Sequence, residues 1–293
     1  IRRLKHFLNR LLLAVLLSFL GGTSHTYAVT INPVFAGGDA PTTNVFGAGN
    51  IHDIMAVAAS WWEAAILDTH AVTINYSWGP LAGVDGETSF TGRIPPSTAS
   101  IVFNNSGSTQ WYMDPEPYNN DEYSSYGDII LNNPASGVDS IITGRNYGSP
   151  NQSDANMLDM VTLAAHEIGH ALGFGQTTLD PIPFELYIEP PLPKAGVWVT
   201  NDATHITGIG DFAAMQQWLT PEALMAVNIS TGYTQTYGQR KLPSELDILA
   251  VAQHSGFVNV DINPQFIPVP PAFWLFGSGL LGLVGIARRR KAA

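Results

Sequence analysis

The stretch VTLAAHEIGHALGFG, residues 161–175, decides how this 293-residue chain is interpreted. Apolar residues recur at helical spacing from Met157 to Leu172, which predicts an amphipathic helix over Asn156–Gly173. Glycine follows the last apolar position, and glycine commonly ends a helix. The segment is therefore expected to be a helix with one buried face, and its polar residues need a separate explanation.

Two histidines stand one turn apart in this helix. His166 and His170 are spaced i and i+4, so their imidazoles project from one face and can reach the same ion. Zinc bound by neutral imidazole nitrogens keeps open positions for water, and Glu167 is the adjacent base. The pattern predicts His166 and His170 as zinc ligands and Glu167 as the catalytic residue; two solvated surface histidines are the disfavoured alternative. Gly169 is expected to let a neighbouring strand or a substrate approach.

The run from Val161 to Gly175 resembles the metzincin metallopeptidases, in particular the matrixin group, whose pattern is HExxHxxGxxH followed by a distant methionine turn. The segment EALMA, residues 222–226, is similar to that turn and contains Met225. The resemblance implies an α+β fold: a metzincin-like catalytic domain with a small twisted sheet, an active-site helix and a mostly irregular C-terminal part. It also implies a zinc-dependent endopeptidase that hydrolyses a protein or peptide substrate by metal-activated water.

The chain departs from the family pattern at the third ligand. The last histidine of the motif should fall at position 176, where this chain has Gln176, and an amide oxygen binds zinc more weakly than imidazole. His205 lies between the predicted helix and Met225 after an irregular insertion, and is the favoured third metal ligand. Gln176 itself and a carboxylate such as Asp180 or Glu185 stay as alternatives.

The same departure leaves other functions open. A degenerate protease fold could serve as a cell-surface or matrix binding protein without catalysis. A metal-dependent hydrolase acting on non-peptide amides is a further alternative. Zinc content and a comparison of casein with small amides as substrates separate these hypotheses.

The remaining elements are expected on either side of this helix. Helices are predicted over Ile51–Leu67, Phe212–Trp218 and Leu246–Gln253, and strands over Ala71–Trp78, Ser100–Phe103 and Asp128–Leu131. Residues 29–49 and 176–198 are rich in glycine, proline and polar side chains, which predicts loops. No second domain is indicated within residues 29–262, the expected metallopeptidase domain.

Charge and cysteine content limit the partners. The chain has 13 Lys and Arg against 24 Asp and Glu, and eight of the 13 cations lie before Leu11 or after Ala287. The acidic interior of the sequence repels phosphates, so nucleic acid is excluded as a partner. There is no cysteine, so a metal must bind to histidine and carboxylate side chains. Calcium is a second candidate metal, but the acidic residues concerned match no defined calcium loop and a solvated loop is favoured: Asp114, Glu116, Asp121, Glu122 and Asp128.

Both ends have features that predict export. Basic residues, the apolar run LLLAVLLSFL (11–20) and a small-residue stretch predict a signal peptide over residues 1–28. Residues 263–293 form a Pro-rich linker, an uncharged span over 272–287 and a basic cluster, and resemble a PEP-CTERM-type sorting signal in its VPxP variant. The resemblance implies an exosortase-type sorting enzyme as partner. It also implies export through the inner membrane to the cell surface or medium of a Gram-negative bacterium, with membrane contact only through this segment.

The C-terminal segment is expected to be removed during sorting, because the basic cluster directly follows the apolar span as in such signals. Mass spectrometry of the exported protein should therefore find no peptide containing Arg288–Lys291. Recovery of that peptide from mature protein would instead support a permanent membrane anchor, the alternative interpretation of an apolar span this close to typical bilayer thickness.

Overall fold

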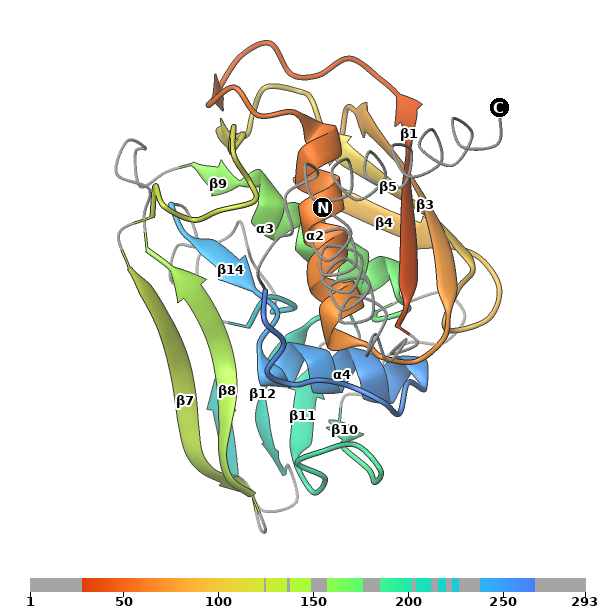
Figure 1. The fold of residues 1–293 in the computed structure, drawn as a ribbon, viewed down its shortest axis with the longest axis vertical. Coiled ribbons are helices and arrows are strands. Elements are labelled where there is room, and N and C mark those ends of the chain that lie inside the picture. Colours follow the sequence, from red (N-terminus) through yellow and green to blue (C-terminus); the bar gives the residue numbers. More distant parts are fainter. Residues whose placement is uncertain are drawn as a thin grey trace, which may run out of the picture.

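The computed structural model describes residues 28–123, 125–135, 138–148, 157–175, 185–201, 204–211, 216–219, 223–226 and 238–266. The predicted signal peptide up to residue 27, the sorting segment from residue 267, Gln176 and Asp180 lie outside these residues. The described part is a mixed α+β fold, as the sequence predicted, and it contains three helices and several small sheets (Figure 1). None of its helices has the length and apolar character needed to cross a bilayer.

One sheet holds four strands in the order β1-β3-β5-β4. Three strands are parallel: β1 (Thr30–Gly37), β3 (Ala71–Gly79) and β5 (Thr98–Asn104). β4 (Gly86–Phe90) pairs antiparallel with β5 and forms one edge. The strands predicted at β3 and β5 are confirmed. β4 was not predicted, because GETSF contains a single large apolar side chain and shows little alternation.

The prediction of a loop over residues 29–49 is wrong for the first part of this range. β1 pairs with β3 from Thr30 onward, with Ile31 opposite Val72. Val29 and Ile31 are buried, and this burial compensates for the weak strand pattern. Pro33 lacks a backbone N–H, but β1 is an edge strand and can accept a proline there.

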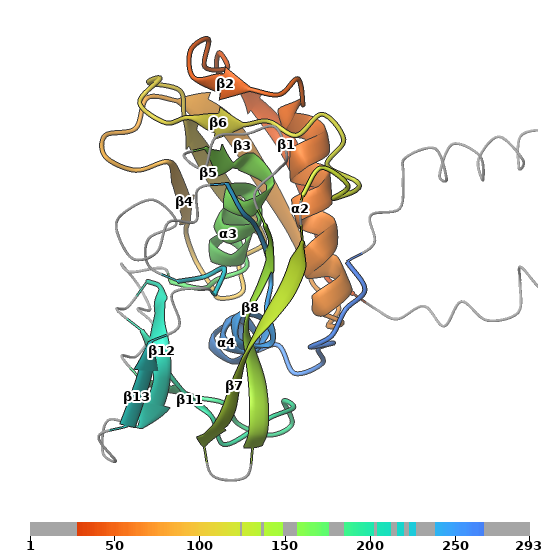
Figure 2. The same ribbon diagram turned by 90° about the vertical axis from the view of Figure 1, so that its left-hand side faces the viewer.

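The three helices occur close to where the periodicity predicts them. They are α2 (Ile51–Ala65), α3 (Met160–Ala171) and α4 (Glu245–Ser255). α2 packs against β1 and α3, while α3 also packs against β4 and β5 (Figure 2). The indole N–H of Trp62 in α2 donates to the backbone oxygen of Ala165 in α3 at 2.8 Å. This buried hydrogen bond joins the two helices beside the histidine pair.

α3 begins four residues later than expected. The two residues before it pair as a strand, in a small sheet with the order β2 (Val45–Phe46), β6 (Trp111–Tyr112) and β9 (Leu158–Asp159). Asp159 then caps the helix, and its side chain accepts from the backbone N–H of Thr162 at 2.9 Å. The cap and the strand together set the first residue of α3.

The C-terminal part is less irregular than expected. It contains an antiparallel sheet of four strands: β10 (Glu185–Tyr187), β11 (Trp198–Asn201), β12 (Ile206–Asp211) and β13 (Gln216–Leu219). The helix predicted over Phe212–Trp218 is wrong at residues 216–218, which belong to β13, where Trp218 pairs opposite Ile209 of β12. Residues 212–215 lie outside the described residues. A seven-residue apolar pattern is too short to separate helix from strand, and the pairing with β12 decides the outcome.

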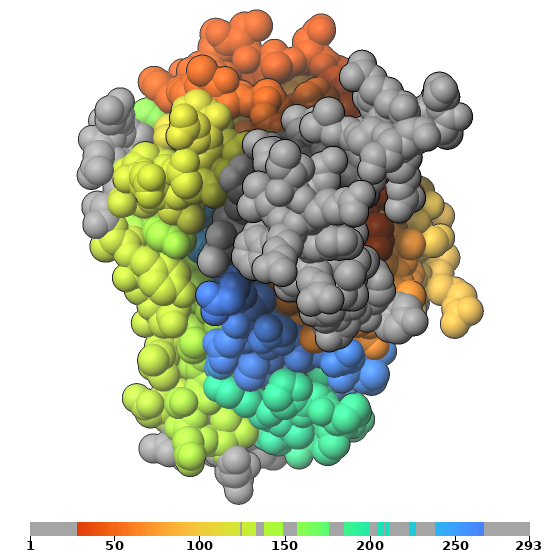
Figure 3. Space-filling model, viewed as in Figure 1, coloured from red at the N-terminus to blue at the C-terminus, as the bar shows by residue number. Residues whose placement is uncertain are grey.

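A long hairpin completes the described part. β7 (Tyr126–Ala135) and β8 (Val138–Tyr147) pair antiparallel, and β14 (Arg240–Leu242) joins β8. The predicted strand Asp128–Leu131 is the middle of β7, whereas β8 was not predicted. α4 packs against β8 and β10, and its surface lies between the hairpin and the β10 region (Figure 3).

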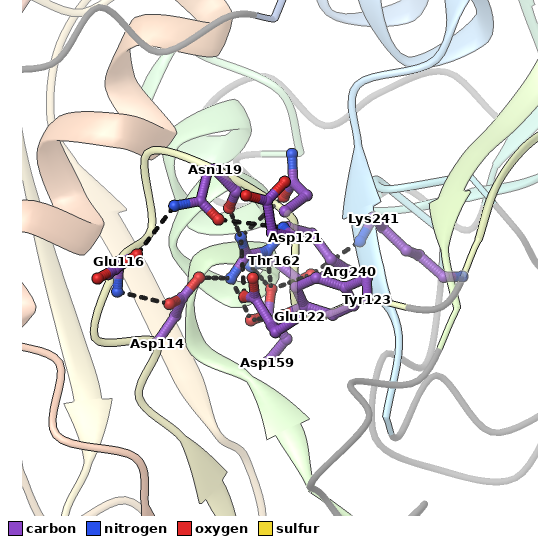
Figure 4. A network of polar contacts seen from close by, with 11 residues as sticks. Asp114, Glu116, Asn119, Asp121, Glu122, Tyr123, Asp159, Thr162, Arg240 and Lys241 are labelled. Atoms are coloured by element: carbon purple, nitrogen blue, oxygen red, sulfur yellow. Dashed lines mark hydrogen bonds and ion pairs between the residues drawn. The ribbon is translucent and has the colours of Figure 1, made fainter.

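Arg240 lies fully buried where the acidic loop meets the start of α3 (Figure 4). Its guanidinium donates to Asp114 at 2.7 Å and to Asp159 at 3.0 Å, and it lies 4.6 Å from the ring centroid of Tyr123. A buried charge is stable only when it is paired and hydrogen bonded, and two carboxylates meet that requirement here. Because Asp159 also caps α3, this network holds the N-terminal end of that helix.

Two of the acidic residues considered for calcium belong to the Arg240 network. Asp114 pairs with Arg240, and Glu122 lies 3.9 Å from the same guanidinium. Burial, followed by a hydrogen bond with Asp114, raises the pKa of Glu122 to about 8. The described acidic loop is therefore organised around an arginine, and calcium binding stays a prediction.

Glu122→Gln should change how stability depends on pH. The folded chain keeps a proton on Glu122 that the unfolded chain releases above pH about 4.5, so the wild type loses stability as pH rises from there to about 8. Glutamine has no such titration. Because Glu122 is partly exposed and solvent screening weakens the effect, the variant should gain on the order of 2 kcal/mol over the wild type between pH 5 and 8. Urea unfolding at both pH values measures this.

Glu116→Gln, in an exposed position of the same loop, is the matched control and should leave the pH dependence as in the wild type. Parallel pH curves for wild type and Glu122→Gln would contradict the assignment. A higher unfolding midpoint in millimolar calcium at pH 7 would support the calcium prediction instead, because binding to the folded state stabilises it.

Candidate metal centre

Three histidines gather beside α3. His166 and His170 lie on successive turns of that helix, and His205 comes from the segment directly before β12. Each offers one ring nitrogen, and these atoms lie within 4.8 Å of one another. The rings of His205 and His166 stack with their centroids 5.3 Å apart. The structure thus brings together the three residues that were predicted as metal ligands.

Backbone carbonyls orient the two helix histidines. His166 Nδ1 lies 2.7 Å from the oxygen of Leu224, and His170 Nδ1 lies 2.7 Å from the oxygen of Phe174. A carbonyl oxygen only accepts hydrogen bonds, so each Nδ1 carries the proton. Each Nε2 is then left with a lone pair, which is the arrangement of an imidazole prepared to bind a metal.

The Nε2 atoms of His166 and His170 are 3.0 Å apart. Two lone pairs at this separation repel each other unless a cation lies between them. Burial, followed by the neighbouring His170 and His205, lowers the pKa of His166 well below its usual value, which disfavours a proton in that role. A zinc ion bound by both nitrogens would hold them roughly 3.3 Å apart in tetrahedral geometry. The donor set of three imidazoles therefore fits zinc.

The Leu224 carbonyl belongs to a buried turn over residues 223–226. In the same turn, the carbonyl of Met225 accepts from the backbone N–H of Ile206 at 2.8 Å, one residue after His205. The turn therefore supports both α3 and the segment that carries the third histidine.

Asp247 in α4 anchors this turn. Its carboxylate accepts from the backbone N–H groups of Leu224 at 3.0 Å and Met225 at 2.8 Å. Asp247 is also half of a capping box with Ser244 at the start of α4, and it is fully buried. A buried carboxylate must be hydrogen bonded in this way, so α4 and the turn are held as one unit.

Two glycines let other segments approach α3. A Cβ at Gly169 would collide with the Met225 sulfur, so Gly169 accommodates the Met225 side chain of the turn at residues 223–226 rather than the strand or substrate that was expected. Gly175 has φ +82°, and a Cβ there would collide with the backbone oxygen of Thr204. The Thr204 hydroxyl lies 2.8 Å from His205 Nδ1. Glycine at 175 thus allows the third histidine to reach the pair.

Glu167 faces the edge strand β4. Its Oε2 accepts from the hydroxyl of Thr88 at 2.6 Å, and its Oε1 would lie only 2.6 Å from a Cβ at Gly86. The carboxylate is buried, and this burial raises its pKa to about 7, with Glu87 and Asp85 contributing and the Thr88 hydrogen bond opposing. A carboxyl group poised near neutrality is suited to take up and return a proton.

The other third-ligand candidates are not part of the described cluster. Gln176 and Asp180 lie outside the described residues, and Glu185, at the start of β10, does not join the histidine group. Sequence reasoning missed Thr88 and Asp247. The pattern Ser-x-x-Asp at residues 244–247 signals a capping box, but nothing local in GETSF points to Thr88.

A scan against protein-family models, a search of curated proteins and a search of solved structures each found no match to this chain. The features that bear on function are those of the site itself: three converging imidazoles, a buried carboxylate beside them and the edge strand β4.

Proposed function

We propose that this protein is a zinc-dependent endopeptidase of the metzincin type. One observation carries the proposal: three imidazoles converge within 4.8 Å while a buried carboxylate occupies the next position on the same helix. Structural zinc sites use four protein ligands, whereas catalytic sites use three and keep a position for water. Three histidines with an adjacent base match the second type.

His166, His170 and His205 would hold the zinc through nitrogens whose rings are already oriented. A zinc ion bound there supplies a Lewis acid that polarises the scissile carbonyl and acidifies water. Glu167 takes the proton from the attacking water and returns it to the leaving amine. Thr88 holds one carboxylate oxygen, so the side chain keeps one orientation during both transfers.

β4 offers a docking edge for an extended substrate. It is the outer strand of its sheet and packs against α3, with Gly86 and Thr88 directed towards Glu167. A peptide that adds to this edge pairs through backbone hydrogen bonds and needs no particular sequence for them. The arrangement would carry the scissile bond past Glu167, which favours peptides over small amides.

The proposal includes export and surface sorting, for which residues 1–28 and 263–293 are the support. The alternative function as a binding protein on a degenerate protease fold was motivated by Gln176. The position of His205 beside His166 and His170 weakens the reason for this alternative, because the site then needs no ligand at position 176.

Glu167→Gln should abolish most peptidase activity and leave zinc content unchanged. The substitution removes the base but keeps all three imidazoles, so kcat should fall by at least about 100-fold. Casein hydrolysis and metal analysis on the same preparation give both numbers. Glu189→Gln, at an exposed position beyond β10, is the control for loss of one negative charge. Unchanged casein hydrolysis in Glu167→Gln would rule out the proposed role.

His205→Ala should release zinc, whereas Gln176→Ala should retain it. Loss of one of three nitrogen ligands leaves two, which hold zinc much more weakly than catalytic sites require. Dialysis against a competing chelator followed by elemental analysis measures the retained metal, and circular dichroism checks that each variant is folded. Zinc lost from Gln176→Ala but kept by His205→Ala would reverse the ligand assignment.

A further inference from the structure

A cavity of about 500 Å³ lies at the end of the sheet where β4 stops. Its wall includes Thr91, Arg93, Ile94, Ser97 and His70. The ring of His70 is held against the loop by a contact between its Nε2 and the Pro96 oxygen at 2.8 Å. The cavity therefore presents a guanidinium, two hydroxyls and an imidazole, a set of groups that suits an anion.

Arg93 differs from the other arginines of the described chain. Arg240 pairs with buried carboxylates, and Arg145 donates to the oxygens of Pro243 and Ile262. Arg93 is exposed and has no hydrogen bond or ion pair with any described residue. Although the chain is rich in acidic residues, this exposed arginine has no carboxylate partner among the described residues, so its guanidinium can bind an external anion.

The cavity is connected to the candidate metal centre by contact and by chain direction. Its loop joins β4 to β5, so it continues the edge strand that faces Glu167. A Cβ at Gly173 would lie 2.8 Å from the Ile94 side chain, and Gly173 is three residues beyond His170. The cavity thus adjoins the C-terminal end of α3.

We propose that this cavity binds a carboxylate of the extended peptide substrate, three to five residues from the scissile bond. The inference rests on the proposed peptidase function. Arg93 lies five positions after Thr88, which contacts Glu167. Because β4 ends at Phe90 and residues 92–95 form bends, this span is at most about 16 Å, the length of five extended residues. A peptide paired with β4 would carry a side chain or terminal carboxylate over that distance to Arg93.

The charges around β4 indicate where in the substrate peptide an acidic residue is favoured. Asp85 and Glu87 flank Gly86, which touches Glu167, so an acidic residue next to the scissile bond would meet like charge. Farther along the same path, Arg93 offers the opposite charge. The enzyme should therefore disfavour acidic residues at the cleaved bond and favour one several residues away, on the side that faces the β4–β5 loop.

Peptide scanning tests this on the zinc-loaded protein. Mass spectrometry first identifies a bond cleaved in casein, and peptides around it then carry either glutamate or glutamine at each of several positions on both sides. On one side, three to five residues from the bond, the glutamate form should show about fivefold higher kcat/KM. Arg93→Gln should remove this preference, and Arg93→Lys should keep most of it.

Thr42→Glu is the matched control for net charge. It lies in the exposed loop after β1, at the opposite end of the sheet from His70, and should keep the preference. A missing preference, or one that persists in Arg93→Gln, would overturn the carboxylate site and leave the peptidase function standing.

If the wild type cleaves no peptide, the proposed function fails and the cavity is tested by binding. Fluorescence anisotropy then compares the glutamate and glutamine peptides on wild type and Arg93→Gln. Tighter binding of glutamate peptides that depends on Arg93 supports the carboxylate site. Equal affinities overturn it.

Discussion

The hydrogen bond between His166 Nδ1 and the Leu224 carbonyl joins the two parts of the molecule that build the histidine cluster. On one side is α3, which carries two histidines and Glu167. On the other is the turn at residues 223–226, which also accepts from Ile206 beside His205 and is anchored by Asp247. One bond therefore fixes the tautomer of a helix histidine and links α3 to the segment that brings the third.

The contacts of this arrangement are buried. The turn, Asp247 and His166 are all buried, so their polar groups cannot form hydrogen bonds with water and bond to one another instead. Gly169 admits the Met225 side chain against α3 without a gap. At the other end of the helix, Arg240 holds Asp159 and with it the first turn. α3 is thus held at its start, its middle and its end by segments far away in sequence.

The sequence predicts local features of this protein better than distant pairings. Helical periodicity predicted α2, α3 and α4, and the HExxH spacing selected His166, His170 and Glu167 as candidate site residues, because both signals lie within a few turns of one helix. The order of motifs also selected His205. β4 and the sheet β10–β13 were missed because strands are specified by partners elsewhere in the chain. Thr88 escaped for the same reason, since its role exists only once β4 packs on α3.

Zinc K-edge X-ray absorption of the purified protein is the decisive test of the proposed three-histidine zinc site, because it reports the atoms around the metal without relying on activity. We expect bound zinc with three imidazole nitrogens at about 2.0–2.1 Å and an oxygen ligand completing a four-coordinate shell. A shell with two imidazoles and additional oxygen ligands, or purified protein that fails to retain added zinc, would contradict it.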